Sequence, residues 1–114
     1  MTTESKLIFK QVCETLNIPE TDVLSKSRKV AVCDARYLCL YFIKTKNKNV
    51  SLNTIGQWFG RSNNGSAHAF VIYGMNQVRT LREIDLEFKQ KFTQCLNDLK
   101  YFDSNINYNN ISQF

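Results

Sequence analysis

The chain has 114 residues, of which 43% are hydrophobic, and it carries a formal net charge of +5. This length and composition predict one compact domain and exclude a chain that stays disordered. The N-terminus shows no basic and apolar leader, and no run of about eighteen apolar residues occurs, so we expect neither secretion nor a membrane span and place the chain in the cytoplasm.

Residues 4–17 are predicted to form the first helix, because apolar residues recur there at helical spacing. The residues of this stripe are Leu7, Ile8, Val12 and Leu16. Pro19 ends the helix, since proline lacks the amide hydrogen and restricts the residue before it. Residues 18–25 then form a connector with one short helical turn, from which Val23 and Leu24 are expected to reach the core.

The longest apolar stretch, residues 28–45, predicts a central helix, because "ARYLCLYFI" is apolar on all sides and suits burial by neighbours. A polar, basic connector, "KTKNKN", follows it. Ser51 is then placed to cap a helix over 51–59, since its hydroxyl can accept a free backbone amide hydrogen. Gly60 stands where that helix ends and the backbone turns left-handed.

After "GRS", a helix is predicted to run to about residue 80, and a further helix covers 83–100. Their inner stripes are Ala67, Val71, Gly74, Met75 and Val78, and then Ile84, Phe88, Phe92, Cys95 and Leu99. The asparagine-rich residues 101–114 are expected to be a flexible tail, in which Tyr101 and Phe102 can extend the last helix. We therefore predict an all-α fold, a small bundle of about five to six helices, with its domain in residues 1–100.

The helices on either side of Gly60 have the sequence shape of a helix-turn-helix. Asn63, Asn64 and Ser66 are expected in the first turn of the second helix, where asparagine can pair bidentately with adenine in the major groove. Gly65 has no side chain and would let the backbone approach DNA closely. The alternative is that Ser62 and Asn63 only cap the helix, and that Gly65 marks a local irregularity.

The positive charge is concentrated in the middle of the chain. Residues 26–61 hold eight basic residues and a single acidic one, Asp34. The basic residues are Lys26, Arg28, Lys29, Arg36, Lys44, Lys46, Lys48 and Arg61. A surface with this bias attracts phosphates by Coulomb attraction and counterion release, although solvated helix faces also collect lysine. Nucleic acid is therefore one of two open interpretations of the charge.

The cysteines and the histidine do not form a recognisable site. Cys13, Cys33, Cys39 and Cys95 include no C-x-x-C pair, and no cysteine lies near His68 in sequence. Each cysteine falls in an apolar helical pattern, so we expect buried reduced thiols and neither a zinc site nor disulfides. No nucleophile is spaced to work with His68, which is expected to point away from the inner stripe or to its edge. We expect no enzyme, no cofactor and no small-molecule substrate.

Two stretches, "LSKSRKVAVCDARYLCLYFIK" and "SLNTIGQWFG", resemble the C-terminal DNA-binding domain of the bacterial chromosomal replication initiator DnaA. In that family a basic "SKxR" segment leads into a helix with an "AR" pair. There follow "SLxxIGxxFG" and a run like "GRDHSTVLHA", which opens the recognition helix. Residues 12–100 can be laid on this pattern.

The recognition segment departs from the family and can be aligned in two ways. If Arg61 is matched to the family arginine, one glycine is deleted and Ser66 falls at a buried valine. A gapless alignment puts residues 63–66 at the base-reading positions and Ala67 at the valine. We prefer the gapless alignment, because it keeps Ala67 in phase with the inner stripe. In both alignments the base-reading residues have changed, so the family's usual binding site is not expected.

The resemblance implies a role for each residue of the interface. Arg36 corresponds to an arginine that enters the minor groove, where a narrow A·T-rich groove concentrates negative potential; the alternative is an ordinary surface salt bridge. Basic residues before it would lie along the phosphates, and the start of the supporting helix can hold a phosphate. The expected interface is Lys26, Arg28, Lys29, Arg36, Ser51, Asn53, Arg61, Ser62, Asn63, Asn64, Gly65 and Ser66.

The sequence therefore predicts sequence-specific binding of double-stranded DNA by a DnaA-like regulator of replication or transcription, with a phage or mobile element as one origin. A replication or transcription protein is a further expected partner, and the oligomeric state stays open. No G-x-x-x-x-G-K-[ST] occurs in this chain, so no ATP-driven origin opening is expected from it. The alternative is a helical protein–protein interaction module that does not bind DNA.

Overall fold

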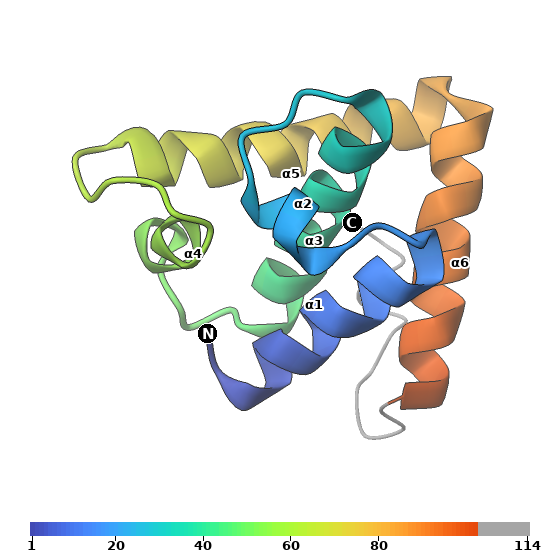
Figure 1. Cartoon of the computed structure of the whole chain (residues 1–114), viewed down its shortest axis with the longest axis horizontal. Coiled ribbons are helices and arrows are strands. Elements are labelled where there is room, and N and C mark those ends of the chain that lie inside the picture. Colours follow the sequence, from blue (N-terminus) through green and yellow to red (C-terminus); the bar gives the residue numbers. More distant parts are fainter. Residues whose placement is uncertain (103–114) are drawn as a thin grey trace.

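The computed structural model describes residues 1–102, and these residues form six α-helices and no strand (Figure 1). The helices are α1 (Thr3–Leu16), α2 (Glu20–Leu24), α3 (Val30–Lys46), α4 (Leu52–Trp58), α5 (Ser66–Ile84) and α6 (Leu86–Phe102). The prediction of a small all-α bundle is confirmed, and the last helix does extend to Phe102. The rest of the expected flexible tail lies outside the described residues.

Helix α3 occupies the centre of the molecule. It contacts α1, α2, α4 and α5, while α6 packs against α1 and α5 at one side (Figure 1). Leu38, Cys39 and Leu40 are fully buried and point to different sides of the helix. A helix surrounded by neighbours needs apolar side chains all round, so the predicted burial of this segment is confirmed.

Aromatic rings and an ion pair connect α6 to α3. Phe92 stacks on Phe42 with ring centroids 5.2 Å apart, and it meets the edge of Tyr41 at 5.6 Å. The Lys91 ammonium lies 3.0 Å from the Asp34 carboxylate, which is the one acidic group of the basic middle segment. These contacts between distant parts of the chain fix α6 on the core.

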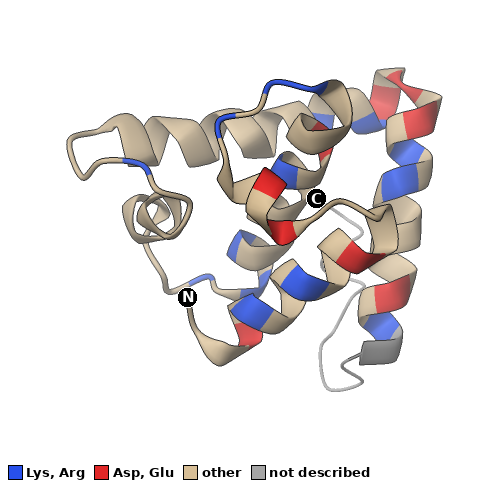
Figure 2. Cartoon of the chain, viewed as in Figure 1, with Lys and Arg blue, Asp and Glu red and all other residues tan. Residues whose placement is uncertain are grey.

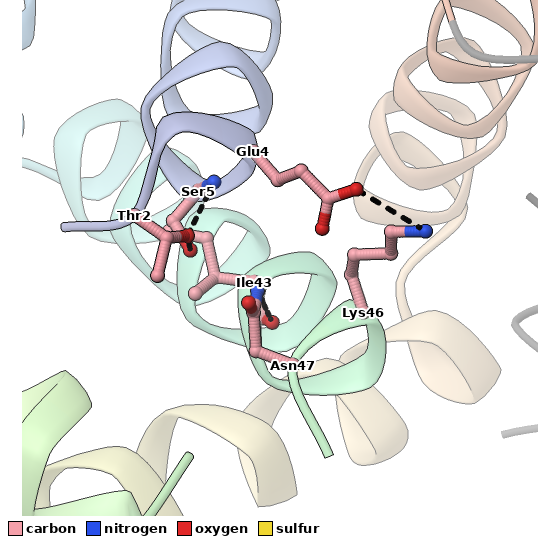
Figure 3. A network of polar contacts seen from close by, with 6 residues as sticks. All are labelled: Thr2, Glu4, Ser5, Ile43, Lys46 and Asn47. Carbon is pink, nitrogen blue, oxygen red and sulfur yellow. Dashed lines mark hydrogen bonds and ion pairs between the residues drawn. The ribbon is translucent and has the colours of Figure 1, made fainter. Parts of the chain in front are cut away.

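The N-terminal end of α1 and the C-terminal end of α3 are each capped by polar groups, and an ion pair joins them (Figure 3). The Ser5 amide donates to Thr2 Oγ1 at 3.1 Å, and Asn47 Nδ2 donates to the Ile43 carbonyl at 2.7 Å. Lys46 and Glu4 form an ion pair at 3.7 Å between the two helices. Lys46 thus stabilises the contact between α1 and α3, although it is one of the eight cations of the basic middle segment.

Three apolar residues expected in the core are exposed. Leu7 and Leu24 are each about two-fifths exposed, whereas Val23 is buried as predicted. Ile84 belongs to the end of α5 and is 74% exposed, so its predicted place in the last helix is wrong. Helix α5 passes the expected end because no glycine or proline stops it. Asp85 makes the boundary instead, since its carboxylate accepts the Phe88 amide at 3.2 Å and caps α6.

The thiols lie in two environments. Cys13, Cys39 and Cys95 are buried as predicted, whereas Cys33 is half-buried. Burial raises the pKa of Cys39 well above its usual value, and burial, with the nearby Asp98 and Cys13, raises the pKa of Cys95 to about 12. Within residues 1–102, no helix is both long enough and apolar enough to cross a membrane.

Candidate nucleic-acid interface

Helices α4 and α5 form a helix-turn-helix and pack closely at Gly56. A Cβ on Gly56 would stand 2.4 Å from the Ala67 carbonyl oxygen, so no larger residue fits at this position without a shift. Ala67 is fully buried, whereas Ser66 is exposed. This pattern agrees with the gapless alignment, which put Ala67 and not Ser66 at the buried valine of the family.

The turn between the two helices contains two left-handed glycines, Gly60 at φ 82° and Gly65 at φ 96°. The second one cannot belong to a right-handed helix, so α5 begins only at Ser66. Asn63 and Asn64 therefore lie in the turn that precedes α5, and their expected place in its first turn is wrong. Both side chains are exposed on the turn.

Hydrogen bonds from Ser62 and Asn64 close the start of α5. The Ser62 carbonyl accepts the Ala67 amide at 3.3 Å and the Ser66 hydroxyl at 3.3 Å. Asn64 Oδ1 accepts the Ser66 amide at 3.3 Å. The helix is thus capped by the Ser62 backbone and by Asn64, and not by Asn63 as the alternative interpretation held.

Asn53 connects α4 to this turn, and Ser51 caps the start of α4. Asn53 Nδ2 donates to Asn63 Oδ1, so the second residue of α4 holds the turn. The Ser51 hydroxyl accepts the Thr54 amide at 3.1 Å, which confirms its predicted role as the cap of α4. Both side chains are committed to the local structure, and their contact with a phosphate stays a prediction.

Residues 25–29, here called the basic loop, connect α2 to α3 and alternate serines with cations. Ser25 Oγ donates to the Asp22 carbonyl at 2.6 Å and accepts the Ser27 amide at 3.1 Å, and Ser27 Oγ in turn accepts the Lys29 amide. The cationic residues Lys26, Arg28 and Lys29 are exposed. The serine side chains therefore hold the loop backbone through hydrogen bonds, and the cationic side chains face solvent.

Arg36 is not at the surface, where both sequence interpretations placed it. It is 6% exposed, and its guanidinium donates to backbone carbonyls in residues 22–27 at distances between 2.8 and 3.4 Å. Its side chain points into the protein, and among the described residues it forms none of the salt bridges that the alternative interpretation expected. It is the seventh residue of α3, nearly two turns into the helix and beneath the basic loop, so carbonyls rather than solvent surround it.

A hollow of about 630 Å³ lies between the basic loop and α5. Four of its lining residues are cationic and none is acidic; these are Lys26, Arg28, Arg36 and Arg61. Phe70 and Tyr73 of α5 form the opposite wall, and the Arg61 guanidinium lies 4.1 Å from the Phe70 ring centroid. Burial and then the charge of Arg36 lower the pKa of Arg61, but arginine remains charged near neutral pH.

Acidic residues gather at one corner of the molecule, and two others, Glu20 and Asp22, lie on α2 before the basic loop. Figure 2 shows the basic connection between α2 and α3 and, at the far end of α5, a group of acidic residues at the corner with α6. That corner contains Glu83, Asp85 and Glu87. No acidic residue lines the hollow, so the local potential there favours a polyanion.

Sequence reasoning missed the aromatic wall of the hollow. Phe70 and Tyr73 follow Ser66 at helical spacing, so they lie on the face of α5 that begins with an expected interface residue. That spacing was available in the sequence. His68 is exposed, as predicted from its place off the inner stripe.

Comparison with known proteins identifies this arrangement. Residues 5–78 match the family described as the bacterial dnaA protein helix-turn-helix. The match covers more than half of the chain and includes the basic loop, α3, the turn and most of α5. The chain belongs to this family.

Similar proteins carry the name chromosomal replication initiator protein DnaA. The protein of Thermodesulfovibrio yellowstonii is 41% identical over 80 residues, covering 70% of this chain and 17% of its own length. The protein of a Brugia malayi Wolbachia is 34% identical over 76% of this chain and 18% of its own length. The chain thus spans about a fifth of the curated DnaA relatives it matches.

Proposed function

We propose that this chain binds double-stranded DNA in a sequence-specific manner and acts as a DnaA-like regulator of replication or transcription. One observation carries the proposal. In a helix-turn-helix of the DnaA family, a hollow lined by cations and free of carboxylates lies on the same surface as an exposed turn with two asparagines. Cations grip phosphates, and short amide side chains can read base edges.

The cations supply the phosphate contacts of the proposed complex. Lys26, Arg28 and Lys29 extend from a backbone that is already fixed by serine hydrogen bonds, so less ordering is needed when DNA binds. Arg61 lies across the hollow from them, at the turn of the helix-turn-helix. Two groups of cations on either side of a hollow can contact the two strands that border one groove.

The turn and the start of α5 supply the base contacts. Asn64 uses one lone pair of Oδ1 on the Ser66 amide, which leaves its amide nitrogen and a second lone pair for an adenine edge. Asn63 is held by Asn53 and stays exposed beside it. Gly65 adds no side chain at this point, so the backbone can lie close to the DNA. These residues differ from those quoted for the family, and we expect a different preferred sequence.

Fluorescence anisotropy of a labelled duplex, titrated at two salt concentrations, tests DNA binding. We expect affinity to fall steeply with salt, and Arg28→Ala to reduce the slope of log K against log salt by about 1. Lys89→Ala is the matched control, because Lys89 is an exposed cation on α6, away from the hollow, and should leave the slope unchanged. Binding that is absent or independent of salt would favour the protein–protein interaction module and refute the proposal.

The biological setting is a second part of the proposal. Bound at its site, this domain would mark the site for a replication or transcription protein, or compete there with a DnaA initiator. A phage or mobile element is a source that fits such a competitor. Selection of bound duplexes from random DNA, followed by a search for the selected site beside replication origins and promoters, separates these roles.

A further inference from the structure

Arg36 satisfies all the hydrogen-bonding capacity of its side chain inside the protein. A guanidinium carries five N–H groups. Nε donates at 2.8 Å, Nη1 at 3.1 and 3.8 Å, and Nη2 at 2.8 and 3.4 Å. The acceptors are the carbonyls of Asp22, Val23, Ser25 and Ser27 and the thiol sulfur of Cys33.

The four carbonyls belong to two adjoining segments, which are also linked by the hydrogen bonds of Ser25 to the Asp22 carbonyl. Asp22 and Val23 are in the last turn of α2, where carbonyls have no intrahelical partner and the helix dipole is negative. Ser25 and Ser27 are in the basic loop, on either side of Lys26. One cation from α3 therefore connects the end of a helix to the loop that follows it.

We propose that Arg36 is the positioning residue of the basic loop, holding residues 22–27 in the one shape that presents Lys26 and Arg28 to the DNA backbone. The inference rests on the proposed function. It assigns Arg36 an indirect role in DNA binding, through the loop, in place of direct entry into a groove. Lysine should not replace it, because an ammonium has three donors at one point and cannot reach carbonyls spread over six residues.

The first test uses no DNA. Trypsin cleavage after Lys26 and Arg28, mapped by mass spectrometry, should be at least about tenfold faster in Arg36→Lys, the factor for loss of one charge-assisted hydrogen bond. Cleavage after Lys89 in α6 is the internal control and should not change. Faster cleavage throughout the chain would reveal a general structural role and overturn the proposal, as would an unchanged loop. Arg36→Gln, if it folds by circular dichroism, should show the larger effect.

The second test is a double-mutant cycle on DNA. In the wild type, replacing both Lys26 and Arg28 by alanine should lower the slope of log K against log salt by about 2. In the Arg36→Lys background the same replacement should lower it by less than about 1, because the loosened loop has already lost those phosphate contacts. Additive losses would mean that Arg36 contacts DNA itself or acts elsewhere, and would overturn the inference. If the wild type does not bind DNA, the proposed function fails, and the trypsin result alone decides whether Arg36 holds the loop.

Discussion

Replacing Gly56 by alanine should separate the two helices of the helix-turn-helix. The new Cβ would lie 2.4 Å from the Ala67 carbonyl oxygen and 2.7 Å from the Ala67 Cα, whereas ordinary contact begins at 3.4 Å. The obstacle is backbone and cannot rotate away, so α4 and α5 must move apart by about 1 Å. Overpacking of this kind costs about 1–3 kcal/mol, and the better helix propensity of alanine offsets at most about 1 kcal/mol of it.

We expect Gly56→Ala to lower the free energy of unfolding by about 1–2 kcal/mol in urea denaturation. Gly74→Ala is the matched control. It gains the same propensity in a buried helix position, but its Cβ meets the end of the Leu40 side chain, which can move. A loss of stability in Gly56→Ala no larger than that in Gly74→Ala would refute the reasoning about the helix contact.

Three further predictions concern the interface and the core. Asn64→Ala should weaken binding to the selected duplex by about 1–3 kcal/mol in anisotropy titrations, with a native circular dichroism spectrum; unchanged affinity would remove Asn64 from the base contacts. In the folded protein, Cys33 should react with a thiol reagent well before the buried Cys13, Cys39 and Cys95, and equal rates for all four would contradict their burial. Burial, chiefly, raises the pKa of Tyr37 from 10.0 to about 12. The folded state thus favours the neutral phenol, and the resulting stability is complete below pH 10 and is lost as the pH rises toward about 12. Between pH 10 and about 12, the free energy of unfolding measured in urea should therefore fall less in Tyr37→Phe than in the wild type. An equal fall in both proteins would contradict this prediction.

The sequence by itself determined the local elements and the family of the chain. Helical spacing of apolar residues located the buried sides of α5 and α6, because a helix places every third or fourth residue on one face. Ser51 and Gly60 marked the ends of α4 correctly, since capping and a left-handed backbone depend on residues within one turn. Local rules were sufficient for local features.

Only the tertiary structure decided what each cation does. Of the eight basic residues in the middle segment, Lys44 donates to backbone carbonyls, Lys46 pairs with Glu4, and Arg36 holds the basic loop. Their partners are either on another helix or on a turn whose path the sequence does not specify. A charge in the sequence has no fixed role until the fold places acceptors or solvent around it, and that placement depends on contacts between segments far apart along the chain.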